Sequence, residues 1–296
     1  MTVSELYAQA TANGIIAGCL YALVAVSFNL IYSTCRFFHF AHSAVIASGA
    51  FAAYVLLWLG APMLVAWLLG IAVAGAIGLG MNVLVYVRLR QNGAHAIELL
   101  LASLGLMVVV QALLSLIFGD DARVLGAPAT VGPTVLLGVR LTDVQLTIGS
   151  VSIVAATLVM LLVHCTRAGT LIRAVANDAP LALAVGAQVE ATISGAFLLG
   201  SAMAGLAGIL AAYDGSLTPG MGLRMYLLGV SAAIVGGVGT YHGALLGALL
   251  IGLIQNLGAI WLPTQWQDAS VFLVLTIFLL VRPEGLLGRH AVAGAH

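Results

Sequence analysis

The sequence predicts an all-α protein: a polytopic transmembrane helical bundle of about 8–10 spans with broken helices, forming one domain over residues 1–296. Hydrophobic residues make up 62% of the chain, charged residues make up 7%, and the mean hydropathy is +1.15. Apolar runs long enough to cross about 30 Å of hydrocarbon recur along the chain, whereas barrel strands would alternate over about ten residues. Helices also satisfy their own backbone hydrogen bonds in lipid, so a helical bundle follows.

Nine apolar runs are expected to be spans. In chain order they cover residues 13–34, 40–59, 62–87, 97–118, 146–164, 193–213, 225–236, 242–261 and 269–281. Small residues at a spacing of four recur in several of them and predict close helix packing. Glycines at positions 236, 237 and 239 interrupt the seventh run, which is either a full span or a half-helix that turns back.

Arginines without nearby acidic residues follow the first, third, fifth and last spans, and the chain has no lysine. They are Arg36, Arg88, Arg90, Arg167, Arg173, Arg282 and Arg289. Under the positive-inside rule these ends are cytoplasmic, so the loops at 120–143 and 214–224 lie outside. The N-terminus is then expected to be extracytoplasmic and the C-terminus cytoplasmic.

One polar stretch, residues 165–192, is conspicuous in a chain with so few charges. Asp178 can cap a short helix, Pro180 is tolerated in its first turn, and Gly186 can end it. Leu181 and Val185, together with Ala184, would then share one apolar face. Such a helix can rest on the membrane surface or dock on a partner protein, and the residues alone favour neither.

Two breaks, near His39 to Ser43 and at Gly236 to Gly239, fall one in each half of the chain. Paired broken segments are typical of a solute path in transporters built from repeats. The expected path residues are His42, Ser43, Gly236, Gly237 and Gly239. The competing interpretation of His42 is a hydrogen bond that holds the broken start of the second span.

Several functional classes lack support in the sequence. A neutral net charge gives nucleic acid binding no electrostatic basis. No H-E-x-x-H or G-x-S-x-G motif and no internal pair of acids predict a catalytic site, so we expect no enzyme. His39 and His42 lack a third ligand nearby in sequence, so no metal site is expected. Without a G-x-x-x-x-G-K-[ST] motif, the chain is expected to bind no cofactor and no ATP.

Two blocks resemble the permease subunits of ATP-binding-cassette importers for branched-chain amino acids, of the LivH kind. The first is YALVAVSFNLIYSTCRFFHFAHSA, residues 21–44, and it makes Asn29 a further candidate for the path. The second runs from residue 169 to residue 288 and includes RAVANDAPLALAVGA, AAIVGGVGTYHGALLGALLIG and RPEGLLG. Ser43 and Ala44 stand where the family usually has Gly-Glu, so the solute does not follow from the resemblance.

The resemblance implies that residues 165–192 hold the helix that couples to a separate ATPase. Arg173, Asn177, Asp178 and Gly186 occupy its motif positions, and Leu181 lies on its apolar face. The implied partners are cytoplasmic ATP-binding subunits that use ATP, a second permease (homologous, or another copy of this chain), an extracytoplasmic solute-binding protein and the bacterial inner membrane. The implied substrates are branched-chain or related small amino acids, with urea and short amides as alternatives within the group.

A different class of function is a stand-alone channel or an ion-coupled secondary carrier for a small polar solute such as urea. A carrier of this kind needs an ionisable group in a span to bind the coupling ion. The candidates in the sequence are His42, Glu98 and Asp214, all near the ends of spans. Uptake by this chain alone, without ATP, would favour this alternative.

Overall fold

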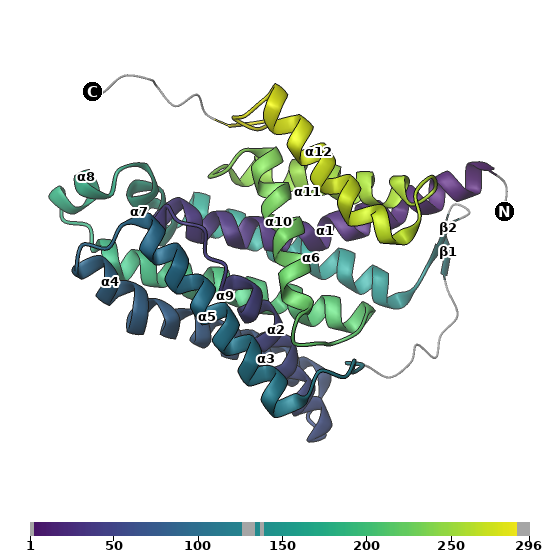
Figure 1. Cartoon of the computed structure of the whole chain (residues 1–296), viewed down its shortest axis with the longest axis horizontal. Coiled ribbons are helices and arrows are strands. Elements are labelled where there is room, and N and C mark those ends of the chain that lie inside the picture. The colour runs from purple at the N-terminus through teal and green to yellow at the C-terminus, as the bar shows by residue number, and fades with distance from the viewer. Residues whose placement is uncertain (1–2, 126–133, 137–138, 289–296) are drawn as a thin grey trace.

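The computed structural model describes residues 3–125, 134–136 and 139–288, which form a bundle of helices (Figure 1). Within that part of the chain, six stretches are long and apolar enough to cross a membrane. They are α1 (Val3–Cys35), the stretch Met63–Gln91, α5 (Ala96–Phe118), α6 (Asp143–Cys165), α9 (Val189–Asp214) and α11 (Tyr241–Gly258). The stretch Met63–Gln91 consists of α3 (Met63–Met81), a π-helical turn (Asn82–Tyr86) and α4 (Val87–Gln91). The predicted polytopic helical bundle is confirmed.

Three apolar helices are too short to cross about 30 Å of hydrocarbon by themselves. They are α2 (His42–Trp58), α10 (Met221–Gly236) and α12 (Gln267–Val281), with 17, 16 and 15 residues. At about 1.5 Å per residue they measure roughly 22–26 Å. The breaks predicted before α2 and after α10 therefore coincide with real helix ends, and α10 begins at Met221, before the predicted start at 225.

The long helix α1 is the centre of the bundle, because it packs against α6, α9, α10 and α11. Gly14 and Gly18 allow the close approach of α11. A Cβ atom at Gly18 would lie 2.9 Å from the Cα atom of Leu249, and one at Gly14 would lie 3.0 Å from the carbonyl oxygen of Gly252. The small residues predicted to give close packing do so at this contact.

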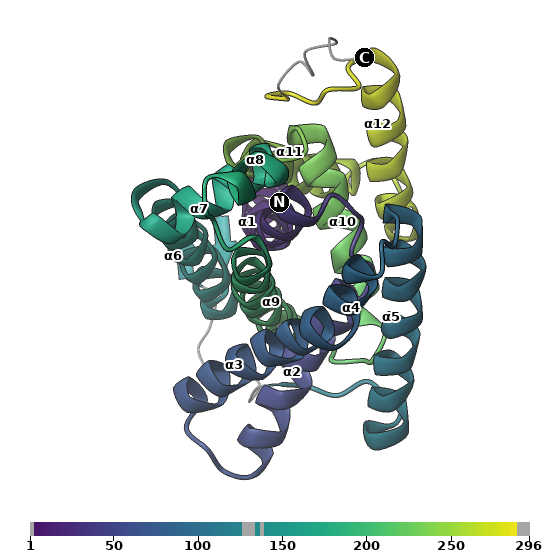
Figure 2. The same cartoon turned by 90° about the vertical axis from the view of Figure 1, so that its left-hand side faces the viewer.

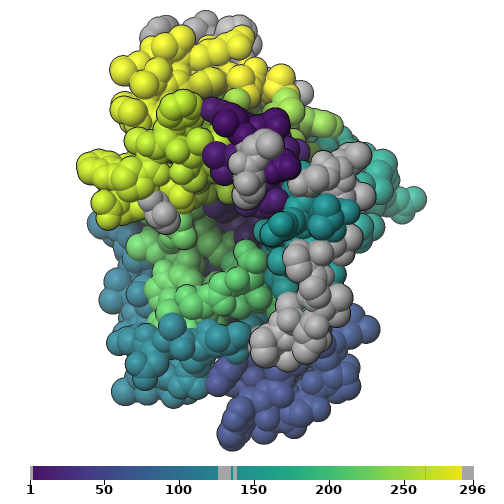
Figure 3. All heavy atoms as spheres, turned by 90° about the vertical axis from the view of Figure 1, so that its right-hand side faces the viewer, coloured from purple at the N-terminus to yellow at the C-terminus, as the bar shows by residue number. Residues whose placement is uncertain are grey.

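The two ends of the bundle carry different structures. At one end, which we call the α8 end, the Arg36 guanidinium beyond α1 donates to the Ala176 carbonyl of α7 (Arg167–Asn177), which leads to α8 (Ala179–Ala184). At the opposite end, the hairpin end, Gln9 of α1 exchanges two hydrogen bonds of 2.9 Å with the Arg140 backbone. Figure 2 faces the α8 end and Figure 3 faces the hairpin end, where the start of α1 lies between α12 and the start of α6.

Three short elements were not predicted. The strands β1 (Thr134–Leu136) and β2 (Val139–Leu141) pair antiparallel at the hairpin end, and a 3-10 turn, Thr264–Trp266, precedes α12.

The helix α7 was also not predicted, because residues 165–192 were expected to hold one short helix. Thr166 caps α7 by accepting a hydrogen bond from Gly169 N–H at 3.1 Å, and Ile172 and Val175 are buried beneath it.

Candidate functional site

The helix α8 is fixed by its own caps. The Leu181 N–H donates to Asp178 Oδ1 at 2.9 Å, and Pro180 occupies the first turn, where no intrahelical N–H is required. Gly186 follows the helix with a φ of 90°, a conformation that favours glycine, and donates to the Leu183 carbonyl at 3.0 Å. The capped helix predicted between Asp178 and Gly186 is therefore present.

An apolar face of α8 is uncovered. Leu181, Leu183 and Val185 are 59%, 64% and 78% exposed, whereas Ala182 is buried against the bundle. Ala184 is exposed as well, so the predicted face of Leu181, Ala184 and Val185 is present, and Leu183 is exposed on another side of the helix. An uncovered apolar patch on an otherwise polar segment marks a contact with a partner or with a membrane.

A groove of about 580 Å³ lies between α8 and the start of α9. It is lined by Ala179, Pro180, Leu183, Gln188, Val189, Glu190 and Ala191. Leu183 lines this groove, whereas Leu181 and Val185 lie on the other side of α8, so the helix is uncovered on both sides.

Residues next to α8 connect it to the spans. The Arg173 guanidinium donates to the Val163 carbonyl at the end of α6 and to Thr170 Oγ1 at 3.4 Å, so this predicted coupling residue also ties α7 to α6. Asn177 is the exposed last residue of α7. A displacement of α8 would therefore reach α6 through α7.

A second connection was not predicted from the sequence. Arg90 of α4 forms a bidentate ion pair with Glu190 in the first turn of α9, at 2.7 Å and 3.2 Å, and also donates to Asn82 Oδ1 at 2.9 Å. The two ionic partners are 100 residues apart, so no local pattern indicates their contact. They join α4 to α9 directly beside the α8 groove.

Asn29 and Gly239, two predicted path residues, are brought together in the structure. The Gly239 N–H donates to Asn29 Oδ1 at 3.1 Å, and Asn29 Nδ2 donates to the Thr240 carbonyl at 3.1 Å. Asn29 is fully buried, and Gly239 has a φ of 85°. This pair of hydrogen bonds pins the loop between α10 and α11 onto α1.

Replacing Asn29 by leucine is expected to lower the stability of the protein by about 2 kcal/mol, because the fully buried Asn29 side chain loses its hydrogen bonds to the Gly239 N–H and the Thr240 carbonyl. The measurement is the midpoint of thermal unfolding of the detergent-solubilised protein. Asn256→Leu is the matched control, because the Asn256 side chain donates to Gly252 on its own helix. Equal losses in the two variants would contradict the assigned contact.

His42 and Ser43 lie where α2 begins. His42 Nε2 is 2.9 Å from Ser27 Oγ of α1, and Ser43 Oγ donates to the Phe40 carbonyl at 2.8 Å. His42 is fully buried. Its contact with Ser27 is the hydrogen bond that was expected to hold the start of the second span. Its other ring nitrogen, Nδ1, is buried and has no hydrogen-bond partner in the part of the chain that the structure describes. Among the described residues, no group of three or more His, Cys, Asp or Glu is placed to hold a metal ion.

Gly236 and Gly237 serve helix packing at the α8 end. A Cβ atom at Gly236 would overlap the Gly243 carbonyl of α11, and Gly237 has a φ of 109°. The segment after α12 lies against this turn, with Leu286 N–H bonded to the Val235 carbonyl at 2.8 Å. Both glycines thus lie at a tight junction of helices, and their role in a solute path stays a prediction.

A chain of four polar side chains, unassigned by the sequence, joins four helices. Arg224 of α10 donates from Nε and Nη2 to Asp268 of α12 at 2.6 Å and 2.9 Å. Gln255 of α11 donates to Asp268 Oδ1 at 2.8 Å, and the Tyr21 hydroxyl of α1 donates to Gln255 Oε1. Arg224 and Asp268 come directly before the apolar runs predicted at 225–236 and 269–281, so the sequence pattern placed both charges outside the helices.

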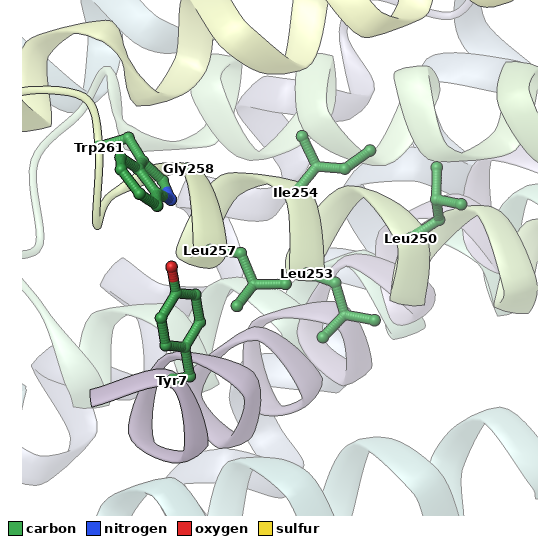
Figure 4. Close-up of a pocket in the computed structure, with 7 residues that line it drawn as sticks. All are labelled: Tyr7, Leu250, Leu253, Ile254, Leu257, Gly258 and Trp261. Atoms are coloured by element: carbon green, nitrogen blue, oxygen red, sulfur yellow. The ribbon is translucent and has the colours of Figure 1, made fainter. Parts of the chain in front are cut away.

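A further groove, between α1 and α11 near the hairpin end, is lined mainly by aliphatic and aromatic side chains (Figure 4). They are Tyr7, Leu250, Leu253, Ile254, Leu257 and Trp261, with Gly258. No converging polar groups would orient a polar solute here, and Tyr7 and Trp261 are typical anchors at a membrane interface. We therefore assign this groove to contact with lipid.

Comparisons with known proteins point to one family of membrane proteins. A family model described as the branched-chain amino acid transport system permease component matches residues 10–281. The chain is 29% identical, over 97% of each chain, to the high-affinity branched-chain amino acid transport system permease proteins LivH of Escherichia coli K12 and BraD of Pseudomonas aeruginosa. Among solved structures, PsaBC from Streptococcus pneumoniae in complex with a Fab covers 91% of this chain and 89% of its own, with a TM-score of 0.50 and 12% identity, which is a likeness of fold alone.

Proposed function

The chain belongs to the branched-chain amino acid transport system permease family, and we propose that it is the translocating subunit of an ATP-binding-cassette importer for branched-chain or related small amino acids. The observation that carries the coupling part of this proposal is α8. It is a capped helix whose three large apolar side chains are uncovered beside an apolar groove. A separate ATPase subunit is the partner that would cover this surface.

The contacts around α8 support a mechanical role. As the ATPases close on ATP, they push α8. The Arg173 contact transmits the movement from α7 to α6, and the Arg36 contact transmits it from α7 to α1. Asn29 links α1 to the loop between α10 and α11, so the movement reaches the short helix α10. Alternating access then follows from the displacement of these helices relative to a second permease chain.

The remaining partners and the orientation complete the proposal. The α8 end and the C-terminus face the cytoplasm of a bacterial cell, and the N-terminus faces outward. A solute-binding protein delivers the solute at the hairpin end, and the second permease is a homologue or another copy of this chain. Because the chain has no lysine and no nucleotide-binding motif of the G-x-x-x-x-G-K-[ST] type, ATP is used by the partner subunits.

Co-purification tests the partnership. The tagged chain, expressed in its native cells and extracted in mild detergent, is expected to retain ATP-binding subunits through size-exclusion chromatography. A tagged chain that elutes without ATPase, while other membrane complexes from the same extract remain intact, would contradict the proposal.

A further inference from the structure

The polar chain of Arg224, Asp268, Gln255 and Tyr21 lies within the membrane-spanning part of the bundle. Between each of these residues and the end of its helix at the α8 end lie 12–14 residue steps. At about 1.5 Å per step, all four lie roughly 18–21 Å from that end. The four side chains therefore share one level of the bundle, and their distance from the α8 end is smaller than the thickness of a hydrocarbon layer, about 30 Å.

An ion pair at this level is unusual. Charged side chains inside a membrane are costly and mark a functional site unless packing alone accounts for them. The Arg224 side chain is 63% exposed and that of Asp268 is 33% exposed, so the pair is open on one side. Within the described residues, Arg224 Nη1 makes no hydrogen bond, and it is available to a ligand.

The pair forms part of a cavity of about 370 Å³ between α10 and α12. Its lining is Gly220, Leu223, Arg224, Leu227, Leu228, Asp268 and Phe272. A positive and a negative group therefore lie side by side among aliphatic and aromatic side chains. This volume is within the range of cavities that hold small organic ligands, about 300–1,000 Å³.

We propose that this cavity is a transit site for the zwitterion of an α-amino acid with an apolar side chain. The Arg224 guanidinium binds the α-carboxylate, Asp268 binds the α-ammonium group, and Leu223, Leu227 and Phe272 surround the apolar side chain. The inference rests on the proposed function and extends it, because it names the chemistry that selects the solute within the membrane.

The other two members of the chain are positioning residues. Gln255 and Tyr21 are buried, and they hold Asp268 through its Oδ1 atom when the guanidinium turns toward a ligand. An empty site is closed by the Arg224–Asp268 pair itself, so neither charge is left unpaired in the membrane. A ligand with two opposite charges can replace both halves of that pair, whereas a ligand with one charge leaves the other half without a partner.

Protection of a cysteine tests the site. The assembled transporter in lipid nanodiscs would carry Leu227→Cys, with Cys19, Cys35 and Cys165 replaced by alanine, and would be labelled with a small neutral maleimide. Leucine at ten times its dissociation constant is expected to slow labelling about ten-fold, because roughly a tenth of the sites stay open. Isopentylamine and 4-methylpentanoate, which each lack one charge, are expected to protect far less. Arg224→Gln or Asp268→Asn should abolish the protection by leucine.

Two results would overturn the inference. One is an unchanged labelling rate with leucine, which would leave the ion pair a helix-packing contact. The other is equal protection by all three compounds, which would show that Arg224 and Asp268 do not recognise the two charges of the ligand. Leucine uptake by the unsubstituted transporter, measured in parallel, separates these failures from failure of the proposed function. The comparison of the three compounds requires no substitution of the ion pair, so misfolding of its variants does not affect it.

Discussion

Replacing Leu181 and Val185 of α8 together by aspartate is expected to reduce ATP-dependent uptake at least about 100-fold. Both side chains are exposed in the isolated chain and would be buried against the ATPase subunit. An unpaired charge buried at such a contact costs several kcal/mol, and each 1.4 kcal/mol is a ten-fold change in association. The substitutions should leave the fold intact, because neither side chain packs in the core. The measurement is uptake together with retention of the ATPase on the purified chain.

Leu171→Asp is the matched control for this prediction. Leu171 is 43% exposed on α7, so the variant adds the same charge to the same polar segment without altering α8. We expect it to retain ATPase binding and most of the uptake. If the α8 double variant still binds the ATPase and transports normally, α8 is not the docking element.

Gly208→Val is expected to prevent folding of the bundle. A Cβ atom at Gly208 of α9 would overlap the carbonyl oxygen of Ile46 in α2, and a backbone group cannot move aside as a side chain can. Overpacking typically costs about 1–3 kcal/mol, and a clash with backbone lies at or above the top of that range. Fluorescence-detected size-exclusion chromatography of a tagged chain should show loss of the folded peak.

Gly195→Val provides the comparison on the same helix. A Cβ atom at Gly195 meets no other atom within 4 Å, so a side chain there has open space. The added valine should leave the folded peak close to that of the unsubstituted chain. A Gly208→Val protein that elutes like the Gly195→Val protein would show that α9 and α2 do not approach as closely as described.

The sequence predicted α8 because its signals are local. A capping aspartate, a proline in the first turn and a glycine after the helix all lie within nine residues, 178–186. The helix α7 has signals of the same kind, with Thr166 as its cap and buried residues at a spacing of three. It was not predicted, because the burial of Ile172 and Val175 depends on contacts with other helices.

The site was predicted only in part, because the sequence shows candidates but not their partners. Asn29 and Gly239 were proposed separately, and their contact over a separation of 210 residues comes from tertiary packing. Arg224 was expected in an external loop, but it lies in the first turn of α10 and pairs with Asp268, which is 44 residues away. The pairing joins the first turns of α10 and α12, and it depends on the packing of these two helices, which no local pattern shows.

Uptake of labelled leucine into proteoliposomes is the most direct test of the account. With the ATPase subunits, the second permease and the solute-binding protein present, uptake should require ATP and stop when the ATPase is removed. The chain reconstituted alone should take up no leucine. Uptake by the chain alone without ATP would contradict the account and would favour a channel or an ion-coupled carrier.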